Sequence, residues 1–174
     1  MIYLPHKAVF IHIPRKAGNS ITSAIASMCA GRGVDIILGT GRVKGWEQTH
    51  RHRRAEVLKG LIEEWEDIYK FAIHRPEEDR IRSAAKLIQR DRENKVYESP
   101  LCTKTWKRVL TGKDESAYWN GFKKQTTNWY IKSEQGEDLG VELHEFSELD
   151  DKWPEICDKC DIPQCILPRL NSSK

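Results

Sequence analysis

Residues Val9 to Met28 read VFIHIPRKAGNSITSAIASM, and this stretch decides the fold that the sequence predicts. It opens with VFIHI, an apolar and mostly β-branched run with one histidine, which is typical of a strand buried on both faces. Pro14 ends the run, because proline cannot donate a hydrogen bond to a neighbouring strand. Four apolar residues then recur at helical spacing: Ile21, Ala24, Ile25 and Met28. The stretch therefore predicts a strand, a tight turn and a helix.

The turn between this strand and this helix has the composition of an anion-binding site. The first backbone N–H groups of a helix have no partner within it and carry the positive end of the macrodipole. Asn19 or Ser20 is the expected N-cap, and Gly18 allows the backbone to approach a ligand closely. Arg15 and Lys16 add positive charge. We expect the turn to hold a phosphate or a sulfate group; the alternative is an ordinary turn whose basic residues are solvated.

A second strand-to-helix segment, YKFAIHRPEEDRIRSAAKLI, covers residues 69–88. Tyr69–His74 predicts a buried strand, and Pro76 suits the start of the following helix. Arg75 leaves the carboxyl end of the strand and Ser83 lies in the first two turns of the helix, where a guanidinium and a hydroxyl would bind a second phosphate. Ligands of open α/β sheets bind outside the carboxyl ends of the strands. The two sites together predict one ligand with two separated anionic groups.

Length and composition predict one globular domain over residues 1–174. The net charge of +3, from 29 basic and 26 acidic residues, is too small for a polycation, and we expect no nucleic-acid partner. No apolar run approaches the ~20 residues of a membrane span. The N-terminus lacks the basic start and long apolar core of a signal peptide. With five cysteines, an odd number, we expect a cytoplasmic protein with reduced thiols and no membrane contact.

Other segments predict the rest of an α/β fold, with helices on a central parallel sheet. The remaining elements are, in chain order, a strand over 34–38, a loop over 39–48, a helix from about Arg53 with Ala55, Leu58, Ile62 and Trp65 on its buried face, helices over 101–110 and 116–122, a strand over 140–146 and a helix from 147 towards Cys160. Cys157 and Cys160, with Cys165, have the spacing of half a zinc or redox site. Because no second pair accompanies them, we expect packing cysteines and no metal site.

His50 and His52 lie just before the helix that begins near Arg53, in the basic run THRHRR. An exposed histidine changes its charge near neutral pH and is suited to proton transfer. The alternative is that this run is simply a solvated basic surface.

Three motifs in this chain resemble those of the sulfotransferase family. FIHIPRKAGNSI is similar to the family's 5′-phosphosulfate loop, typically a strand, then P-K-T-A-G-T-S, then a helix. FAIHRPEEDRIRSA is similar to its 3′-phosphate motif, typically F-x-x-V-R-N-P-x-D-R-x-x-S. Leu143–Phe146 and Leu167–Asn171 are similar to the R-F-E-x-L and L-P-H-x-N segments of the carbohydrate sulfotransferase branch. The motifs lie in the family's order and span nearly the whole chain.

The resemblance implies a single sulfotransferase-like domain with a P-loop-like three-layer fold. It implies an enzyme that moves the sulfuryl group of 3′-phosphoadenosine 5′-phosphosulfate to a hydroxyl or amine, most simply of a carbohydrate, without a metal. The product is 3′-phosphoadenosine 5′-phosphate. The residues that match the 5′ loop are Arg15, Lys16, Ala17, Gly18, Asn19 and Ser20, and those that match the 3′-phosphate site are Arg75 and Ser83.

The resemblance also assigns catalytic roles. His52 matches the family's H-x-x-A base, with His50 in reserve. The family's loop lysine, a cation beside the leaving oxygen, is replaced here by Arg15, with Lys16 next in sequence. Three alternatives stay open: Lys16 takes the lysine's place, Arg15 acts through its charge alone because arginine does not release its proton, or turnover is slow or absent.

Two other functions compete with this interpretation. A kinase-like P-loop enzyme that uses ATP and Mg²⁺ would need the Gly-Lys pair of G-x-x-x-x-G-K-[ST] and a metal-binding aspartate after a strand, and the sequence shows neither clearly. A non-catalytic protein that binds the nucleotide or anionic glycans is compatible with arginine at position 15. Nucleotide binding without activity would identify this last alternative.

Overall fold

The computed structural model describes residues 1–30, 36–38 and 52–168. These residues form two compact units. The first unit contains the chain up to Arg75 and from Thr127 onward, and the second contains Pro76–Thr126. Two compact units can still belong to one domain, so the single domain expected over residues 1–174 stays a prediction.

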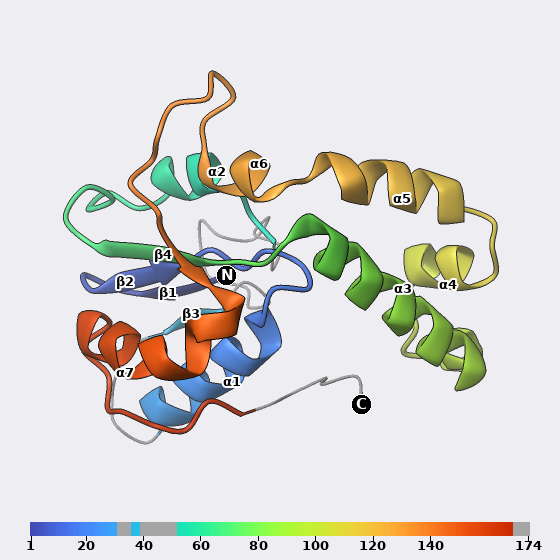
Figure 1. Ribbon diagram of the computed structural model, residues 1–174, viewed down its shortest axis with the longest axis horizontal. Coiled ribbons are helices and arrows are strands. Elements are labelled where there is room, and N and C mark those ends of the chain that lie inside the picture. The colour runs from blue at the N-terminus through green and yellow to red at the C-terminus, as the bar shows by residue number, and fades with distance from the viewer. Residues whose placement is uncertain (31–35, 39–51, 169–174) are drawn as a thin grey trace. The chain divides into compact units, whose positions relative to one another are not determined.

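A five-stranded sheet in the order β3-β1-β2-β4-β5 forms the centre of the first unit (Figure 1). The strands are β1 (Ile2–Leu4), β2 (Ala8–Phe10), β3 (Ile37–Leu38), β4 (Tyr69–His74) and β5 (Glu142–Glu145). β2 pairs with β4, and β4 with β5, in parallel, whereas β1 is antiparallel to both β2 and β3. The α/β class is thus confirmed, but the sheet is mixed rather than wholly parallel.

The antiparallel strand β1 is the main element that sequence patterns did not predict. A tight turn joins it to β2, with the Lys7 N–H donating to the Leu4 carbonyl at 3.1 Å and His6 at a φ of 60°. So short a connection leaves the chain no room to cross over, and the two strands must run antiparallel. Three residues are too few for a periodic pattern to reveal a strand.

Helices cover both faces of the sheet (Figure 1). The helices of the first unit are α1 (Gly18–Cys29), α2 (Ala55–Lys59), α6 (Thr127–Ile131) and α7 (Leu149–Lys159). α1 and α7 pack with Phe10, Phe71 and Ile73 in one apolar cluster, and α2 and α6 pack with Val9 and Ala72 in another. None of the helices among the described residues combines the length and apolarity needed to cross a membrane.

The predicted elements differ from the observed ones mainly at their ends. β4 occupies the predicted residues, but α2 ends at Lys59 because Gly60, a poor helix former, follows. Ile62 and Trp65 are buried beyond that helix, as the pattern suggested. β2 ends at Phe10, but the next residue still bonds to β4, with the Ile11 N–H donating to the Phe71 carbonyl at 2.9 Å. Ile11, His12 and Ile13 stay buried. Residues 34–35 and the predicted loop over 39–48 lie outside the described residues.

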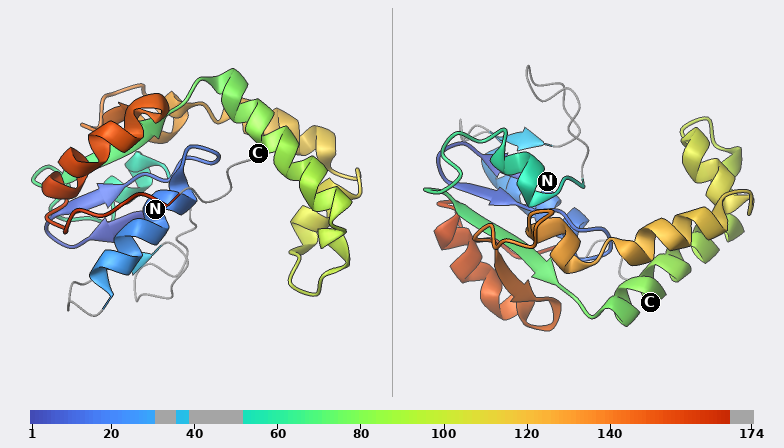
Figure 2. Two further views of the ribbon diagram at one scale, coloured as in Figure 1. Left: turned by 60° about the horizontal axis from the view of Figure 1, so that its bottom comes forward. Right: turned by 90° about the horizontal axis from the view of Figure 1, so that it is seen from above.

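The second unit is helical over its described residues, with α3 (Glu77–Glu93), α4 (Lys104–Leu110), α5 (Glu115–Lys124) and the single turn η1 (Val96–Glu98). α3 and α5 run antiparallel (Figure 2). Near the start of α3, Arg80 donates to the Phe122 carbonyl at 2.8 Å, and near its end Arg92 forms an ion pair with Glu115. The spacing of Ile81, Ala84, Ala85 and Ile88 predicts an apolar buried stripe on α3. Ala84 and Ile88 are buried, but Ala85 is exposed and the charged Arg80 is fully buried, so the prediction is wrong at position 85.

Candidate functional site

The turn after β2 lies at the carboxyl edge of the sheet, beside the end of β4. β2 and β4 are parallel neighbours. From β2 the chain continues through α1 to β3 on one side of this pair, whereas β4 leads towards β5 on the other side. Such a reversal of strand order is where open α/β sheets bind ligands. The first predicted anion site, residues 15–20, and Arg75 of the second adjoin it.

The backbone of this turn has the conformation of known anion-binding turns. Arg15 and Ala17 adopt the left-handed region, with φ of 66° and 57°. Turns of this kind point successive N–H groups into one concavity. α1 then begins at Gly18 with Ala17 as its N-cap and with no acidic side chain in its first turn. The predicted N-caps, Asn19 and Ser20, are instead the second and third helical residues, so the positive helix end lies closer to Arg15 than expected.

Gly18 is required by a protein contact. A Cβ added there would lie 1.7 Å from Nε2 of His12, whose side chain is only 4% exposed. The prediction was that a ligand would approach this glycine closely. The space beside Gly18 is instead occupied by the imidazole of His12. Sequence reasoning gave His12 no role, although a lone histidine within a buried apolar run was a visible signal.

His52 is anchored to the same turn through its ring. Its Nδ1 lies 2.9 Å from the carbonyl oxygen of His12, and the two imidazoles meet edge to face with centroids 4.6 Å apart. A carbonyl only accepts hydrogen bonds, so Nδ1 carries the proton and Nε2 is the basic atom of the neutral ring. His52 is exposed, and its proton-transfer role stays a prediction. His50 lies outside the described residues.

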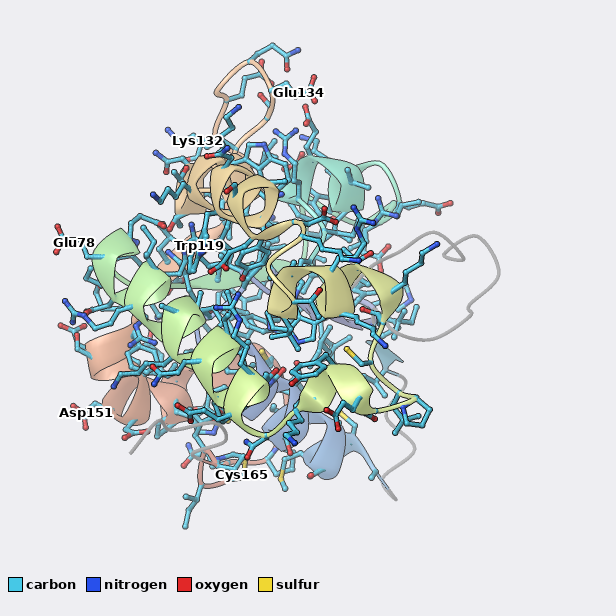
Figure 3. The ribbon with its side chains drawn as sticks, turned by 90° about the vertical axis from the view of Figure 1, so that its right-hand side faces the viewer. Glu78, Trp119, Lys132, Glu134, Asp151 and Cys165 are labelled. Carbon is cyan, nitrogen blue, oxygen red and sulfur yellow. The ribbon has the colours of Figure 1, made fainter. Side chains whose placement is uncertain are left out.

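Arg54 fixes the segment that carries His52. Its Nε donates to the Trp129 carbonyl at 2.8 Å, and it forms ion pairs with Glu56 at 3.3 Å and with Glu134 at 3.1 Å. Glu134 lies in the connection that follows α6 (Figure 3). The start of α2 and the end of α6 are thereby held together, which limits how far His52 can move.

Lys16 is fully buried within the first unit. Its Nζ donates to the Arg75 carbonyl at 3.0 Å and to the Thr127 hydroxyl. The ammonium thus ties the turn after β2 to the end of β4 and the start of α6. Thr127 is a site residue that no sequence pattern indicated. The cofactor-binding role expected for Lys16 stays a prediction.

Arg75 is a half-buried cation without an acidic partner among the described residues. Its Nη1 donates to the Arg15 carbonyl at 3.4 Å, its guanidinium lies 4.6 Å from the centre of the Phe146 ring, and its buried Nε has no hydrogen-bond partner. Six other arginines each pair with a carboxylate, namely Arg54, Arg80, Arg82, Arg90, Arg92 and Arg108, whereas the half-buried Arg53 shares with Arg75 an unpartnered Nε. Burying a charge without a partner is costly. Arg75 is therefore a candidate for binding an external anion, and this role stays a prediction.

Ser83, the second residue predicted for the 3′-phosphate site, belongs to the other unit. It lies in α3 of that unit, so its pairing with Arg75 on one phosphate stays a prediction. The hollow lined by Arg92, Tyr97, Leu110, Thr111 and Gly112 also belongs to the second unit and contains none of the predicted site residues.

Cys157 of α7 and Cys160, the C-cap residue that follows the helix, are packing residues. Cys157 and Cys160 are fully buried in the apolar cluster formed with α1. Burial raises the pKa of the Cys157 thiol to about 11 and that of Cys160 to about 12, which keeps both protonated at neutral pH. Within the described ranges, no group of three or more His, Cys, Asp or Glu side chains is placed to hold a metal ion.

Comparison with known proteins adds no relative to this description. No family model matches the chain, and no curated protein or solved structure matches it significantly. The function is therefore argued from the site's own residues and from the three motifs that they carry.

Proposed function

We propose that the protein is a sulfotransferase of P-loop-like fold that moves the sulfuryl group of 3′-phosphoadenosine 5′-phosphosulfate to a hydroxyl, most simply of a carbohydrate. One observation carries the proposal: Arg75 is a half-buried guanidinium with an unsatisfied Nε–H and no acidic partner among the described residues. Phosphate oxygens accept hydrogen bonds from a guanidinium in the geometry that arginine offers. The motif match assigns this residue to the 3′-phosphate.

The turn after β2 fits the other end of the nucleotide. The left-handed backbone at Arg15 and Ala17 and the first amides of α1 would hold its negatively charged 5′ end. The bound nucleotide would supply an activated sulfuryl group. Arg15 would stabilise the charge that remains on the donor phosphate after transfer, acting through its charge because arginine keeps its proton.

His52 would take up the proton that the acceptor hydroxyl releases. Its Nδ1–H is engaged by the His12 carbonyl, which fixes the tautomer and leaves Nε2 as the base. The hydrogen bond also fixes the plane of the ring. His12 is thus the residue that orients the base, through a carbonyl that no side-chain substitution removes.

A non-catalytic binding protein for the same nucleotide is the second candidate, and the burial of Lys16 favours it. The ammonium of Lys16 is held by the Arg75 carbonyl and the Thr127 hydroxyl, away from solvent. The positive charge that the family places beside the leaving oxygen then depends on Arg15 alone. Binding of the nucleotide without transfer to any hydroxyl acceptor would establish this candidate.

Arg75→Ala tests the anion site. We expect the dissociation constant for 3′-phosphoadenosine 5′-phosphate, measured by calorimetry, to rise by the equivalent of about 1.5–3 kcal/mol, because a hydrogen-bonded charge is lost. Arg82→Ala is the matched control, since Arg82 is exposed and pairs with Asp79 at 2.8 Å, and it should leave the affinity unchanged. Equal affinities for the wild type and Arg75→Ala would contradict the assignment, and tighter binding of ATP with Mg²⁺ would favour a kinase-like enzyme.

His52→Asn tests the base. Asparagine keeps a donor near the position of Nδ1 and removes the basic Nε2, so we expect turnover to fall by about 10²–10⁴-fold while nucleotide affinity is retained. Transfer is measured with labelled donor and a panel of carbohydrate acceptors. Parallel loss of affinity and turnover would show that His52 supports the structure rather than the proton transfer.

A further inference from the structure

Arg75 and Phe146 occupy equivalent places at the carboxyl edge of the sheet. β4 and β5 are parallel, with His74 paired to Glu145 as the last pair of the ladder. Arg75 and Phe146 are the residues that follow these two, so their side chains leave neighbouring strands at the same level. The guanidinium carbon of Arg75 lies 4.6 Å from the centre of the Phe146 ring.

The Phe146 ring is not needed by the apolar core. It is 40% exposed and belongs to neither apolar cluster of the first unit, in contrast to Phe10 and Phe71, which are 1% exposed. An aromatic ring left half in solvent, with an uncompensated cation on its face, contributes mainly through that cation.

We propose that Phe146 is the positioning residue that presents Arg75 to the anion, an inference that rests on the proposed function. Stacking uses the face of the guanidinium and leaves its N–H donors, which lie in the plane, for other partners. Nη1 reaches the Arg15 carbonyl at 3.4 Å, and Nη2 forms no hydrogen bond with the described residues. The ring and the carbonyl together restrict the guanidinium, so a phosphate meets a side chain that is already ordered.

The test compares Phe146→Leu with Phe146→Tyr, each alone and combined with Arg75→Ala. Leucine keeps an apolar side chain without a ring, whereas tyrosine keeps the ring. We expect Phe146→Leu to weaken the binding of 3′-phosphoadenosine 5′-phosphate by about three- to tenfold and Phe146→Tyr to bind as the wild type does. Combined with Arg75→Ala, Phe146→Leu should weaken binding no further, because a positioning residue acts only through its partner.

Trp129→Leu is the matched control, since Arg54 lies 5.0 Å from the centre of the Trp129 ring but has two carboxylate partners. It should leave the nucleotide affinity unchanged. Two results would overturn the inference: Phe146→Leu binds as tightly as the wild type, or it weakens binding equally with and without Arg75. The urea midpoint of each variant shows whether it is folded.

A separate readout distinguishes this inference from the proposed function. The Nε–H of Arg75 is buried, so its ¹H–¹⁵N resonance is expected to exchange slowly and to be shifted by the ring of Phe146. If the wild type does not bind the nucleotide, the sulfotransferase proposal fails, and inorganic sulfate is titrated while this resonance is followed. A sulfate-dependent shift that Phe146→Leu abolishes and Phe146→Tyr keeps supports the positioning role. A resonance that does not respond to sulfate, or that responds equally in all three proteins, overturns it.

Discussion

Replacing Gly18 with alanine tests how the turn after β2 is built. The new Cβ would lie 1.7 Å from Nε2 and 1.9 Å from Cδ2 of His12, far inside the ~3.5–4.0 Å of favourable carbon contacts. The imidazole of His12 is 4% exposed and is stacked on the ring of Phe10, with centroids 5.7 Å apart. Because interiors are close-packed, the ring cannot move aside without displacing its neighbours.

The size of the effect follows from two opposing contributions. Forcing an extra methyl into a packed site destabilises the fold by about 1–3 kcal/mol. Gly18 is not among the residues with positive φ, so alanine fits its backbone and contributes up to about 1 kcal/mol of helix propensity. We expect Gly18→Ala to lower the free energy of unfolding by about 1–2 kcal/mol. In a His12→Ala background the imidazole no longer occupies the space beside Gly18. Gly18→Ala should then raise the free energy of unfolding by about 0.5–1 kcal/mol.

Urea unfolding of the wild type, both single variants and the double variant measures this reversal of sign. Gly121→Ala is the control, because Gly121 is a helical glycine of α5 with no atom within 4 Å of an added Cβ, and it should stabilise the protein. If Gly18→Ala stabilises the wild type, or has the same sign in both backgrounds, the steric argument is wrong.

Two further predictions concern buried ionisable groups of the first unit. Lys16→Met should lower the free energy of unfolding by about 1–3 kcal/mol in urea titrations, because the Arg75 carbonyl and the Thr127 hydroxyl lose a buried donor. An unchanged urea midpoint would show that the hydrogen bonds of the ammonium do not stabilise the fold. Burial lowers the pKa of His144 below its usual 6.5, so the unfolded chain binds the proton more readily than the folded protein does. The free energy of unfolding should therefore be largest above pH 6.5 and fall as the pH drops through that value. His144→Gln should flatten this decline, and a decline of equal steepness in the variant would assign it to other groups.

Local patterns predicted much of the first unit, because its strands and helices bury residues at regular spacing. Tyr69–His74 is buried on both faces and was predicted at its observed bounds. Features set by distant partners were not predictable. Lysines are almost never fully buried, so nothing in the sequence indicated that Lys16 would be enclosed. The start of α1 was misplaced because polar residues at 19 and 20 suggested a side-chain cap, whereas packing of Gly18 on His12 lets the helix begin earlier, after a left-handed Ala17.

The candidate site shows the same division. Residue types and their order located the turn after β2 and Arg75 at the carboxyl ends of neighbouring strands. They could not show that Arg75 stacks on Phe146, since the two residues are 71 positions apart and meet only through the pairing of β4 with β5. Nor could they show that the carbonyl of His12 orients the His52 ring, because every residue has a backbone carbonyl and the residue type does not reveal which one is used.

The contacts of Lys16 also show that the two ends of the segment forming the second unit lie close together. Arg75 and Thr127 flank that unit on either side, and each has an oxygen within 3.0 Å of the same ammonium. The chain leaves the first unit at Arg75 and re-enters it at Thr127. Lys16, from the turn after β2, therefore holds these two points together. Such closely spaced ends are typical of positions that tolerate domain insertion. A variant in which a short glycine-serine linker replaces residues 76–126 would keep both contacts of Lys16, and its urea unfolding would show whether the first unit folds by itself.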